Sequence, residues 1–493
     1  MISTLEKLSE SDFLRIIQEK DLCIQTLRWE LAQLKRMIFA AKSERFAPVE
    51  LPGQLSMEMN VAQGTEGVKE TTVTVEAHRR RTKKEEPKAP FRNPFPAHLP
   101  REIVEIRPEG DLRGCTEISR EITEVLELTE AKLFVKRYER IKYAKPQEEG
   151  VLIGSLPSRI IEKGLFGQSL LTQIILDKYA DHLPIYRQMQ RFDREGVKIA
   201  YSTLADVPRQ ISQALYPLYE LLVKEVMGSG YLQADETPTP VLDRDKKGKT
   251  HRGFYWVYRS PEKRLILFDY RQGRGRDGPA QMLSEFEGFL QTDGYAVYDD
   301  FEKRKEITLA GCMAHARRYF QKAMDSDPAR AAFVIKEMQK LYEAEKIIRD
   351  ENKSSGEILG LRKELSRPVL QDLETWLKEQ LVQVTPKSPM GQAIAYSLAR
   401  WGKLIRYLDH PQLEIDNNLV ENAIRPSVIG RKNYLFAGSH EGARRSAMFY
   451  SFLGSCRENK INPQHWLRDV ISIIMDTKTS RLHTLLPSSW KPR

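Results

Sequence analysis

The sequence predicts a multidomain protein of mixed α and β structure. Its 493 residues are too many for one ordinary hydrophobic core. Between residues 231 and 313 the apolar side chains alternate with a period near two, which is typical of strands. Over residues 316–410 they recur every three or four positions instead, which is typical of amphipathic helices. We therefore expect a β-sheet region followed by a long helical segment.

Composition favours a folded cytoplasmic protein with polyanionic partners. Apolar residues make up 41% of the chain and charged residues 30%, the balance of a globular protein. The 78 Lys and Arg residues exceed the 68 Asp and Glu residues, which gives a formal net charge of +10 and favours nucleic acid. The sequence contains no long apolar run and no signal segment at its start, so we expect no membrane contact.

A heptad pattern runs through residues 1–46. Apolar residues repeat every seventh position, at Ile17, Ile24, Leu31 and Ile38. A stripe of this kind is buried only by pairing with another helix, so it predicts a coiled coil that assembles a homo-oligomer. The alternative is an amphipathic helix packed against its own chain.

Two further segments precede the first long helical region. Residues 47–96 are polar and contain a basic run from His78 to Lys84, which is typical of a linker that touches phosphates without sequence preference. A solvated charge cluster would look the same. Residues 97–150 show short alternating apolar segments, which predict a small β module.

Residues 151–228 predict a helical DNA-binding region. A helical pattern is interrupted at Glu195-Gly196-Val197, and a second helix capped by Ser202 follows, which is the outline of a helix-turn-helix. Two helices around a glycine are common in other proteins, but basic residues decorate this pair. The candidate DNA contacts here are Arg187, Arg191, Lys198, Ser202 and Thr203.

Five strands are expected between residues 229 and 320. They span residues 231–235, 253–259, 264–270, 289–293 and 307–313, with a helix at 279–286 before the fourth. Short polar connections between the first three strands predict an antiparallel meander. Helices fill residues 321–410, a further helix begins at Asn417 within residues 411–475, and residues 476–493 form a tail.

Three acidic residues stand out by position. Asp235 and Asp293 end the first and fourth expected strands, where rigid backbone could hold them side by side, and Glu421 lies on the later helix. Three converging carboxylates suit one or two Mg²⁺ ions, which can promote phosphodiester displacement. Each residue also has an ordinary explanation: a solvated acidic pair at Asp235, a turn at Asp293 and a helix cap at Glu421.

Several strings resemble the transposases of the IS66 insertion-sequence family. They include Ser155-Leu156-Pro157-Ser158-Arg159, Lys178-Tyr179-Ala180-Asp181-His182, Ser202-Thr203-Leu204-Ala205-Asp206, Ala234-Asp235-Glu236-Thr237-Pro238, Thr292-Asp293-Gly294-Tyr295, Ala314-His315-Ala316-Arg317-Arg318, Glu414-Ile415-Asp416-Asn417-Asn418 and Gly430-Arg431-Lys432-Asn433. The resemblance covers essentially the whole chain. It implies an RNase H-like catalytic domain of the DDE type, split into residues 229–320 and 411–475 by a helical insertion at 321–410.

The resemblance also implies the chemistry. Asp235, Asp293 and Glu421 would be a triad that binds Mg²⁺, for which Mn²⁺ substitutes. The partners would be double-stranded DNA of the element ends and target, and accessory proteins of the same element, with the protein associated with the nucleoid. Family members usually carry two cysteine pairs that bind zinc, but only Cys115 remains in that region, so zinc is not supported.

Two further groups of residues are candidates for DNA contact. The family's Cys-x-x-His string is Cys312-Met313-Ala314-His315 here, and we expect a structural or DNA-positioning role for His315, with a buried helix-start histidine as the alternative. After Glu421 come Arg425, one helical turn on, and Arg431 and Lys432, expected in a loop. Their charges could hold a phosphate, or Arg425 could simply pair with Glu421.

The sequence therefore predicts a DNA transposase that cleaves and joins strands at insertion-sequence ends. Three alternatives remain at this stage. The first is a non-enzymatic DNA-binding regulator derived from a transposase. The second is a different RNase H-like nuclease that hydrolyses DNA without joining it. The third is a coiled-coil scaffold, which would leave the acidic residues without a role.

Overall fold

A computed structural model describes residues 133–135, 142–144, 151–153, 158–161, 164–242 and 249–492. The predicted coiled coil at 1–46 and linker at 47–96 lie outside these residues, as does most of the β module at 97–150. Near the end of that module, β1 (Lys142–Ala144) pairs in antiparallel fashion with β2 (Val151–Ile153). The rest of the fold described below belongs to the same unit of the chain, which extends from Glu127 to Arg493.

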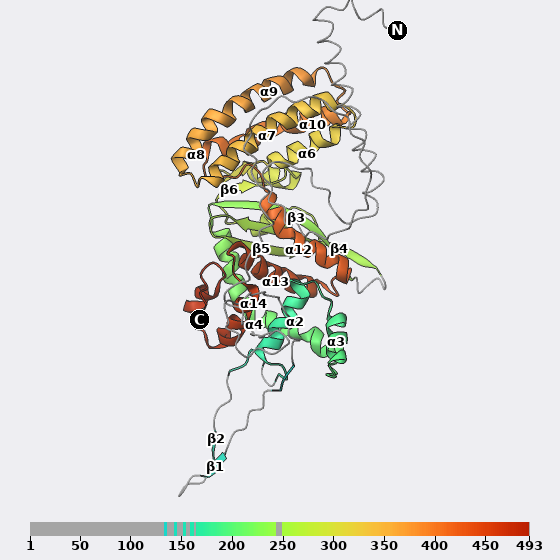
Figure 1. The fold of residues 1–493 in the computed structure, drawn as a ribbon, viewed down its shortest axis with the longest axis vertical. Helices are drawn as coiled ribbons and strands as arrows, with labels where there is room; N and C mark the ends of the chain where they lie inside the picture. Colours follow the sequence, from blue (N-terminus) through green and yellow to red (C-terminus); the bar gives the residue numbers. More distant parts are fainter. Residues whose placement is uncertain are drawn as a thin grey trace, which may run out of the picture. The chain divides into compact units, whose positions relative to one another are not determined.

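A five-stranded mixed sheet lies between two groups of helices (Figure 1). Its strands are β3 (Tyr231–Leu242), β4 (Thr250–Ser260), β5 (Leu265–Arg271), β6 (Gly288–Gln291) and β7 (Ile307–Ala310). They neighbour one another in the order β5-β4-β3-β6-β7. The first three strands form the predicted antiparallel meander, whereas β6 joins β3, and β7 joins β6, in parallel. The expected mixture of α and β structure is confirmed.

Strand β3 is longer than predicted, because its two prolines do not interrupt its hydrogen bonds to β4. Pro238 and Pro240 have the same orientation in the strand as Leu242, whose N–H donates to the carbonyl of Ala437 at 2.8 Å on the edge away from β4. A proline that faces this edge removes no hydrogen bond of the β3–β4 ladder. Since β6 pairs only with the start of β3, Asp235 lies just where β3 leaves its parallel neighbour.

One group of helices shares a core with the sheet. Its members are α2 (Gln168–Tyr179), α3 (Ile185–Arg194), α4 (Tyr201–Met227), α12 (Asn418–Tyr434), α13 (His440–Glu458) and α14 (Pro463–Ile473). Helices α4 and α13 pack on β5, and α12 packs on β3. Ile174, Leu215, Trp256 and Trp466 are fully buried in this core. In Figure 1 these helices, apart from α12, lie on the β5 side of the sheet.

The second group of helices has a core of its own. It comprises α6 (Met313–Ala323), α7 (Pro328–Asp350), α8 (Ser355–Leu361), α9 (Arg367–Leu381), α10 (Pro389–Ala399) and α11 (Trp401–Leu404). Phe320, Leu341 and Leu377 are fully buried there. Figure 1 shows these helices beyond β6, on the other side of the sheet from α4 and α14. Their presence agrees with the helical pattern of the sequence, and their status as an inserted domain stays a prediction.

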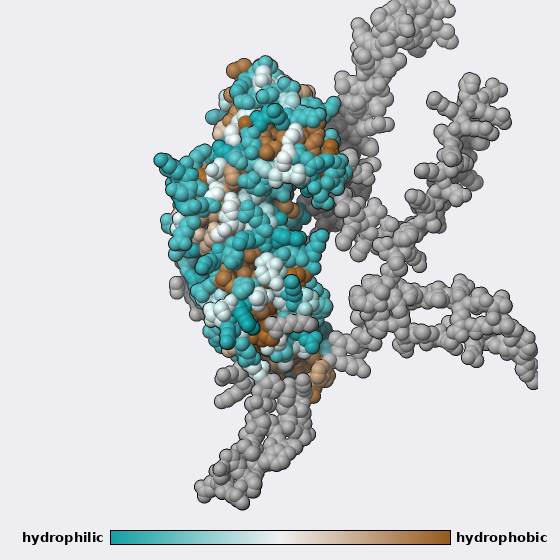
Figure 2. All heavy atoms as spheres, turned by 90° about the vertical axis from the view of Figure 1, so that its left-hand side faces the viewer, coloured by the Kyte–Doolittle hydropathy of each residue, from teal (hydrophilic) through white to brown (hydrophobic). Residues whose placement is uncertain are grey.

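Short helical segments complete the described chain. They are α5 (Asp277–Met282), the 3₁₀ segments Ala296–Lys303, Arg406–Asp409, Ile474–Asp476 and Thr479–Leu485, and a π-helical stretch at Arg362–Ser366. Cys312 and Cys456 are both free and buried, as small apolar side chains would be. Among the described residues, no helix combines the length and apolarity needed to span a membrane. On the face drawn in Figure 2, hydrophilic residues predominate, with small apolar patches between them.

The helix-turn-helix outline is present, but its second helix differs from the prediction. Helix α4 begins at Tyr201, because Ala200 already has the extended conformation of an N-cap, and Ser202 therefore lies inside the first turn rather than capping it. The preceding turn contains Gly196 with φ of +77°, a conformation that glycine adopts freely. Helix α4 is 27 residues long and buries one side, which includes Leu204, while exposed residues such as Ser202 and Tyr216 recur along the other side.

Candidate active site

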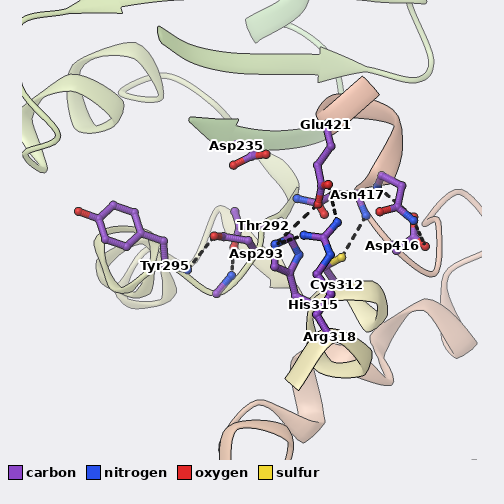
Figure 3. A network of polar contacts seen from close by, with 12 residues as sticks. Asp235, Thr292, Asp293, Tyr295, Cys312, His315, Arg318, Asp416, Asn417 and Glu421 are labelled. Atoms are coloured by element: carbon purple, nitrogen blue, oxygen red, sulfur yellow. Dashed lines mark hydrogen bonds and ion pairs between the residues drawn. The ribbon is translucent and has the colours of Figure 1, made fainter. Parts of the chain in front are cut away.

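Three elements carry the three acidic residues singled out above. Asp235 lies on β3, Asp293 follows β6 in a loop, and Glu421 lies in the first turn of α12. Figure 3 shows the three side chains around one region, contributed by β3, the loop after β6 and the start of α12. Asp235 was expected at the end of its strand but lies within β3, which continues to Leu242. Register explains the first two positions, because Gln233 of β3 pairs in parallel with Gln291 of β6, and Asp235 and Asp293 each follow two residues later.

The carboxyl group of Asp235 is buried among other acidic residues. Burial raises the pKa of its carboxyl group well above the usual value, and the negative charges of Glu236, Asp293 and Glu421 raise it further. The backbone N–H of Glu236, which donates to Asp235 Oδ1 at 2.7 Å, favours the charged form. Glu236 is itself held by an ion pair with Arg274. A cluster of repelling carboxylates lowers the stability of the fold and is typical of functional sites.

The Asp293 loop is fixed by hydrogen bonds from the second group of helices. Asp293 Oδ1 accepts a bond from the N–H of Tyr295 at 2.8 Å, and its carbonyl accepts one from the hydroxyl of Tyr396 at 2.6 Å. Arg400 donates to the carbonyl of Gly294 at 3.0 Å. Gly294 has φ of +86°, and a Cβ there would lie 2.5 Å from the Arg400 side chain. Helix α10 thus positions the loop that carries the carboxylate.

Glu421 is paired with Arg318 on helix α6, as the dashed lines in Figure 3 show. Arg318 also donates to His315 Nε2 at 3.0 Å, and that nitrogen lies 3.7 Å from Glu421 Oε1. His315 and Arg318 are one helical turn apart and so share a face of α6. The cation beside Glu421 is therefore Arg318 and not Arg425, which is exposed one turn further along α12.

The side chains of His315 and Cys312 contact different partners. Burial and the positive charge of Arg318 lower the pKa of His315, although nearby carboxylates oppose this. Since an arginine always donates, His315 Nε2 accepts from Arg318, which requires a neutral imidazole. Cys312 Sγ instead accepts a hydrogen bond from the backbone N–H of Asn417 at 3.4 Å, and burial raises the pKa of its thiol. The two side chains thus join the start of α6 to the start of α12.

The carboxylates have the donor chemistry for a divalent cation. Hard cations such as Mg²⁺ take carboxylate oxygens, and the buried Glu421 Oε1 makes no hydrogen bond to any described residue. As placed, however, no three His, Cys, Asp or Glu side chains of the described residues form a group able to hold a metal ion. Arg318 is bonded to the other oxygen of Glu421. The residue types therefore suit a divalent cation, and in this structure Glu421 is paired with Arg318 instead.

Several residues at this site were not predicted from sequence. Arg318 was quoted only as part of a family string, although its position one turn after His315 is a usable signal. Tyr396 and Arg400 come from the helical stretch, more than 100 residues beyond the loop that they hold. No spacing in the sequence points to a contact at that separation, so only the fold reveals it.

The predicted DNA contacts of the helix-turn-helix lie in two settings. Arg187, Lys198, Ser202 and Thr203 are exposed on α3, on the turn and on the start of α4. Arg191 instead forms an ion pair with Asp177, a buried carboxylate of α2. Arg191 thus fastens α3 to α2, a role that the sequence pattern did not suggest.

The basic residues after Glu421 belong to one continuous helix. Arg431 and Lys432 were expected in a loop but lie in the last turn of α12, which continues through Pro426 to Tyr434. Helix α12 ends at Tyr434, and the φ of +65° at its C-cap residue Leu435 turns the chain back so that Ala437 bonds to the edge of β3. Lys432 is exposed, whereas Arg431 is half-buried and faces other elements of the first core.

Comparison with known proteins identifies the family. A family model described as "Transposase IS66 family" matches residues 163–445, more than half of the chain, and spans all three carboxylates. The chain belongs to this family. A second model, "IS66 C-terminal element", matches residues 451–488 of the same IS66 transposase. A third, "Transposase C of IS166 homeodomain", matches residues 26–104, which overlap the predicted coiled coil and linker and lie outside the described residues.

Similar proteins occur in Sinorhizobium fredii. Uncharacterized protein y4hP is 30% identical over 95% of this chain and 89% of its own length. Uncharacterized protein y4qI is 35% identical over 81% of this chain and 78% of its own. Uncharacterized protein y4jD is 29% identical over 96% of both chains. These names state no activity, so the functional argument depends on the family and on the site.

Proposed function

We propose that this IS66 transposase cleaves and joins DNA strands at the ends of an insertion sequence, with Asp235, Asp293 and Glu421 as its metal-binding residues. The observation that carries the proposal is electrostatic. Burial and the charge of Glu236 raise the pKa of Asp235 most, and the charges of Asp293 and Glu421 raise it further, so the carboxylates from β3, the β6 loop and α12 interact. In a chain of a transposase family, such a cluster just beyond the paired residues of β3 and β6 supports a DDE active site.

The surrounding fold supports an RNase H-like catalytic domain. It would consist of residues 229–320 and 411–475, because the mixed sheet and α12 together carry the acidic residues. The helices over residues 321–410 would be an insertion between the two parts. Their separate core supports that division, and the bonds from Tyr396 and Arg400 give the insertion a task, which is to hold the Asp293 loop.

Bound Mg²⁺, or Mn²⁺ in its place, would activate the attacking oxygen and stabilise the leaving oxygen of the phosphodiester. The chain's own residues prepare that site. The β3 backbone holds Asp235, and the Gly294 turn holds Asp293. Without a metal ion, Arg318 neutralises the charge of Glu421. When Glu421 binds a metal ion instead, the guanidinium of Arg318 would be free to bind a DNA phosphate. Neutral His315 orients Arg318 for both states.

The DNA would be double-stranded DNA of the element ends and of the target. Exposed basic residues at α3 and the start of α4 would contribute to its binding, as would Arg425 and Lys432 on α12. Assembly of a homo-oligomer by residues 1–46, and the use of accessory proteins from the same element, belong to the same proposal.

Metal binding provides a direct test that does not need turnover. The full chain on element-end DNA would be titrated with Mn²⁺, and bound ions would be counted by electron paramagnetic resonance. We expect wild type to bind Mn²⁺ and the variants Asp293→Asn and Glu421→Gln to lose it. The control is Asp372→Asn, which changes an exposed carboxylate on α9. Equal Mn²⁺ binding by all four proteins would refute the assignment of the metal ligands.

A further inference from the structure

A second concave site lies away from the carboxylates. It is a cavity of about 200 Å³ bordered by α2, α4, β3, β4, α12 and α13. Three cations line it, Lys178, Arg431 and Arg445, and none of the described residues that line it is Asp or Glu. Tyr201 and Phe436 lie at its wall with 55% and 40% of their surfaces exposed. The cavity is therefore basic and aromatic, and it opens to solvent.

The cations in this pocket lack the partners that buried charges normally have. Lys178 Nζ lies 5.5 Å and 5.6 Å from the ring centroids of Tyr179 and Tyr434, and no described carboxylate pairs with it. Burial, together with the positive charge of Arg445, lowers the pKa of Lys178 to about 8. Burial also lowers the pKa of Arg431. Desolvated positive charges gathered without a counter-charge are unfavourable unless an anion joins them.

Other titratable groups line the same cavity from the neighbouring elements. They are Tyr179 on α2, Tyr201 on α4, Tyr255 on β4, Arg431 and Tyr434 on α12, and Arg445 and Tyr450 on α13. Burial raises the pKa of Tyr434 to about 12 and shifts the pKa values of Tyr179, Tyr255 and Tyr450 further upward. None of these four tyrosines becomes an anion near neutral pH. Asp206 on α4 interacts with Arg445 from outside the lining, but its carboxylate is bonded to Arg209.

The backbone adds donors to the same pocket. Helix α13 begins there with Ser439 as N-cap, whose hydroxyl accepts the N–H of Gly442 at 3.0 Å. The helix has 19 residues, and its first turn carries the positive end of the helix dipole. Ser439 and Gly442 both line the cavity. A phosphate there would meet backbone N–H groups together with the side-chain cations.

Two elements fix the separation between this pocket and the carboxylates. Arg431 follows Glu421 by ten residues on α12, which corresponds to about 15 Å along the helix axis. Thr239, another lining residue, follows Asp235 by four residues on β3, which corresponds to about 13 Å along the strand. These lengths match the rise of about four nucleotides in one DNA strand.

We propose that this pocket binds a backbone phosphate of the DNA strand that is cut, about four nucleotides from the phosphate at Asp235, Asp293 and Glu421. The inference rests on the proposed function, since it assumes that DNA enters at the carboxylates. Lys178, Arg431 and Arg445 hold the phosphate, and the exposed rings of Tyr201 and Phe436 contact the adjoining sugar or base. The contact sets the register of the strand before any reaction begins.

The test measures binding without metal, so it is independent of catalysis. The full chain binds short duplexes copied from the DNA flanking the gene, each with one phosphate replaced by an uncharged methylphosphonate. Wild type should lose about tenfold in affinity at one or two positions near the fourth nucleotide from the cut. Lys178→Gln and Arg445→Gln should lose a similar factor on unmodified DNA and become insensitive to that one replacement. Lys336→Gln, an exposed lysine of α7, should behave as wild type.

Two results would overturn the proposal. One is a sensitivity profile that Lys178→Gln and Arg445→Gln leave unchanged. The other comes from wild type alone, through acetylation of Lys178 followed by mass spectrometry. DNA should shield Lys178 from the reagent, and shielding by inorganic phosphate but not by DNA would assign the pocket to a free anion. Wild type that joined no strands but kept its sensitivity to the methylphosphonate replacement would refute the proposed function. The assignment of this pocket as a phosphate site would still hold.

Discussion

Arg362 joins helix α7 to the chain that returns from the second group of helices to α12. It donates two hydrogen bonds to the carboxylate of Glu345, at 2.7 and 2.8 Å. It also donates to the carbonyls of Tyr407, His410 and Leu413 at 2.7, 3.1 and 2.9 Å. Both charged side chains are only 3% exposed. This one guanidinium therefore fixes the segment just before the helix that carries the third carboxylate.

The substitution Arg362→Met leaves the charge of Glu345 buried without a partner. Breaking a buried ion pair in this way costs about 3–5 kcal/mol. The three backbone carbonyls also lose their hydrogen-bond donor, which lowers the free energy of unfolding by about a further 1 kcal/mol or more. We therefore expect the free energy of unfolding to fall by at least about 4 kcal/mol. Adding Glu345→Leu removes the stranded charge and should restore about 3 kcal/mol of it.

Urea denaturation followed by tryptophan fluorescence would measure both effects. Trp376 and Trp401 belong to the second core, so they report on the helices that Arg362 holds. The single variant should show a much lower midpoint than wild type, and the double variant an intermediate one. A double variant no more stable than Arg362→Met would refute the reasoning, because the loss would then come from the carbonyls and not from the buried charge.

Three other substitutions give separate tests. Gly288→Ala should lower the free energy of unfolding by about 1–3 kcal/mol or more, because φ is +127° and the new Cβ would lie 2.2 Å from the carbonyl oxygen of Gly230. An unchanged melting temperature would contradict this. Arg318→Gln should free Glu421 and tighten Mn²⁺ binding in the absence of DNA, measured by paramagnetic resonance; unaltered affinity would argue against competition. DNA affinity of wild type should fall as pH rises through about 8, because Lys178 then loses its proton in the free protein. The DNA affinity of Lys178→Gln should depend less on pH, and an equal pH dependence in the two proteins would exclude Lys178 as the titrating group.

Local patterns in the sequence predicted most elements of the sheet. Alternation gave the three antiparallel strands and located the two short parallel ones, since strand periodicity depends only on neighbouring residues. The ends were less accurate. The fourth strand stops at Gln291 and not at Asp293, because the chain turns at Gly294 with positive φ. The fifth stops at Ala310, because Met313 already begins α6.

The candidate site likewise contains residues that the sequence predicted and residues that it did not. Strand ends and a family resemblance were enough to single out Asp235, Asp293 and Glu421, but the partners of these residues were not predictable. Arg318 reaches Glu421 from a helix 103 residues earlier, and Tyr396 reaches Asp293 over the same separation. Contacts of this kind follow from how two cores pack on one sheet, and periodicity within a single element does not encode such packing.

Strand transfer in vitro tests the central claim most directly. Short duplexes copied from the DNA flanking the gene would be incubated with Mg²⁺ or Mn²⁺ and either wild type or Asp235→Asn, with accessory proteins of the element added in a parallel series. The account predicts joined DNA products from wild type, none from Asp235→Asn, and equal DNA affinity for the two proteins. Joined products of equal yield from Asp235→Asn would contradict the assignment of the triad. A stable complex without products in every mixture, accessory proteins included, would make this chain a DNA-binding derivative and not an enzyme.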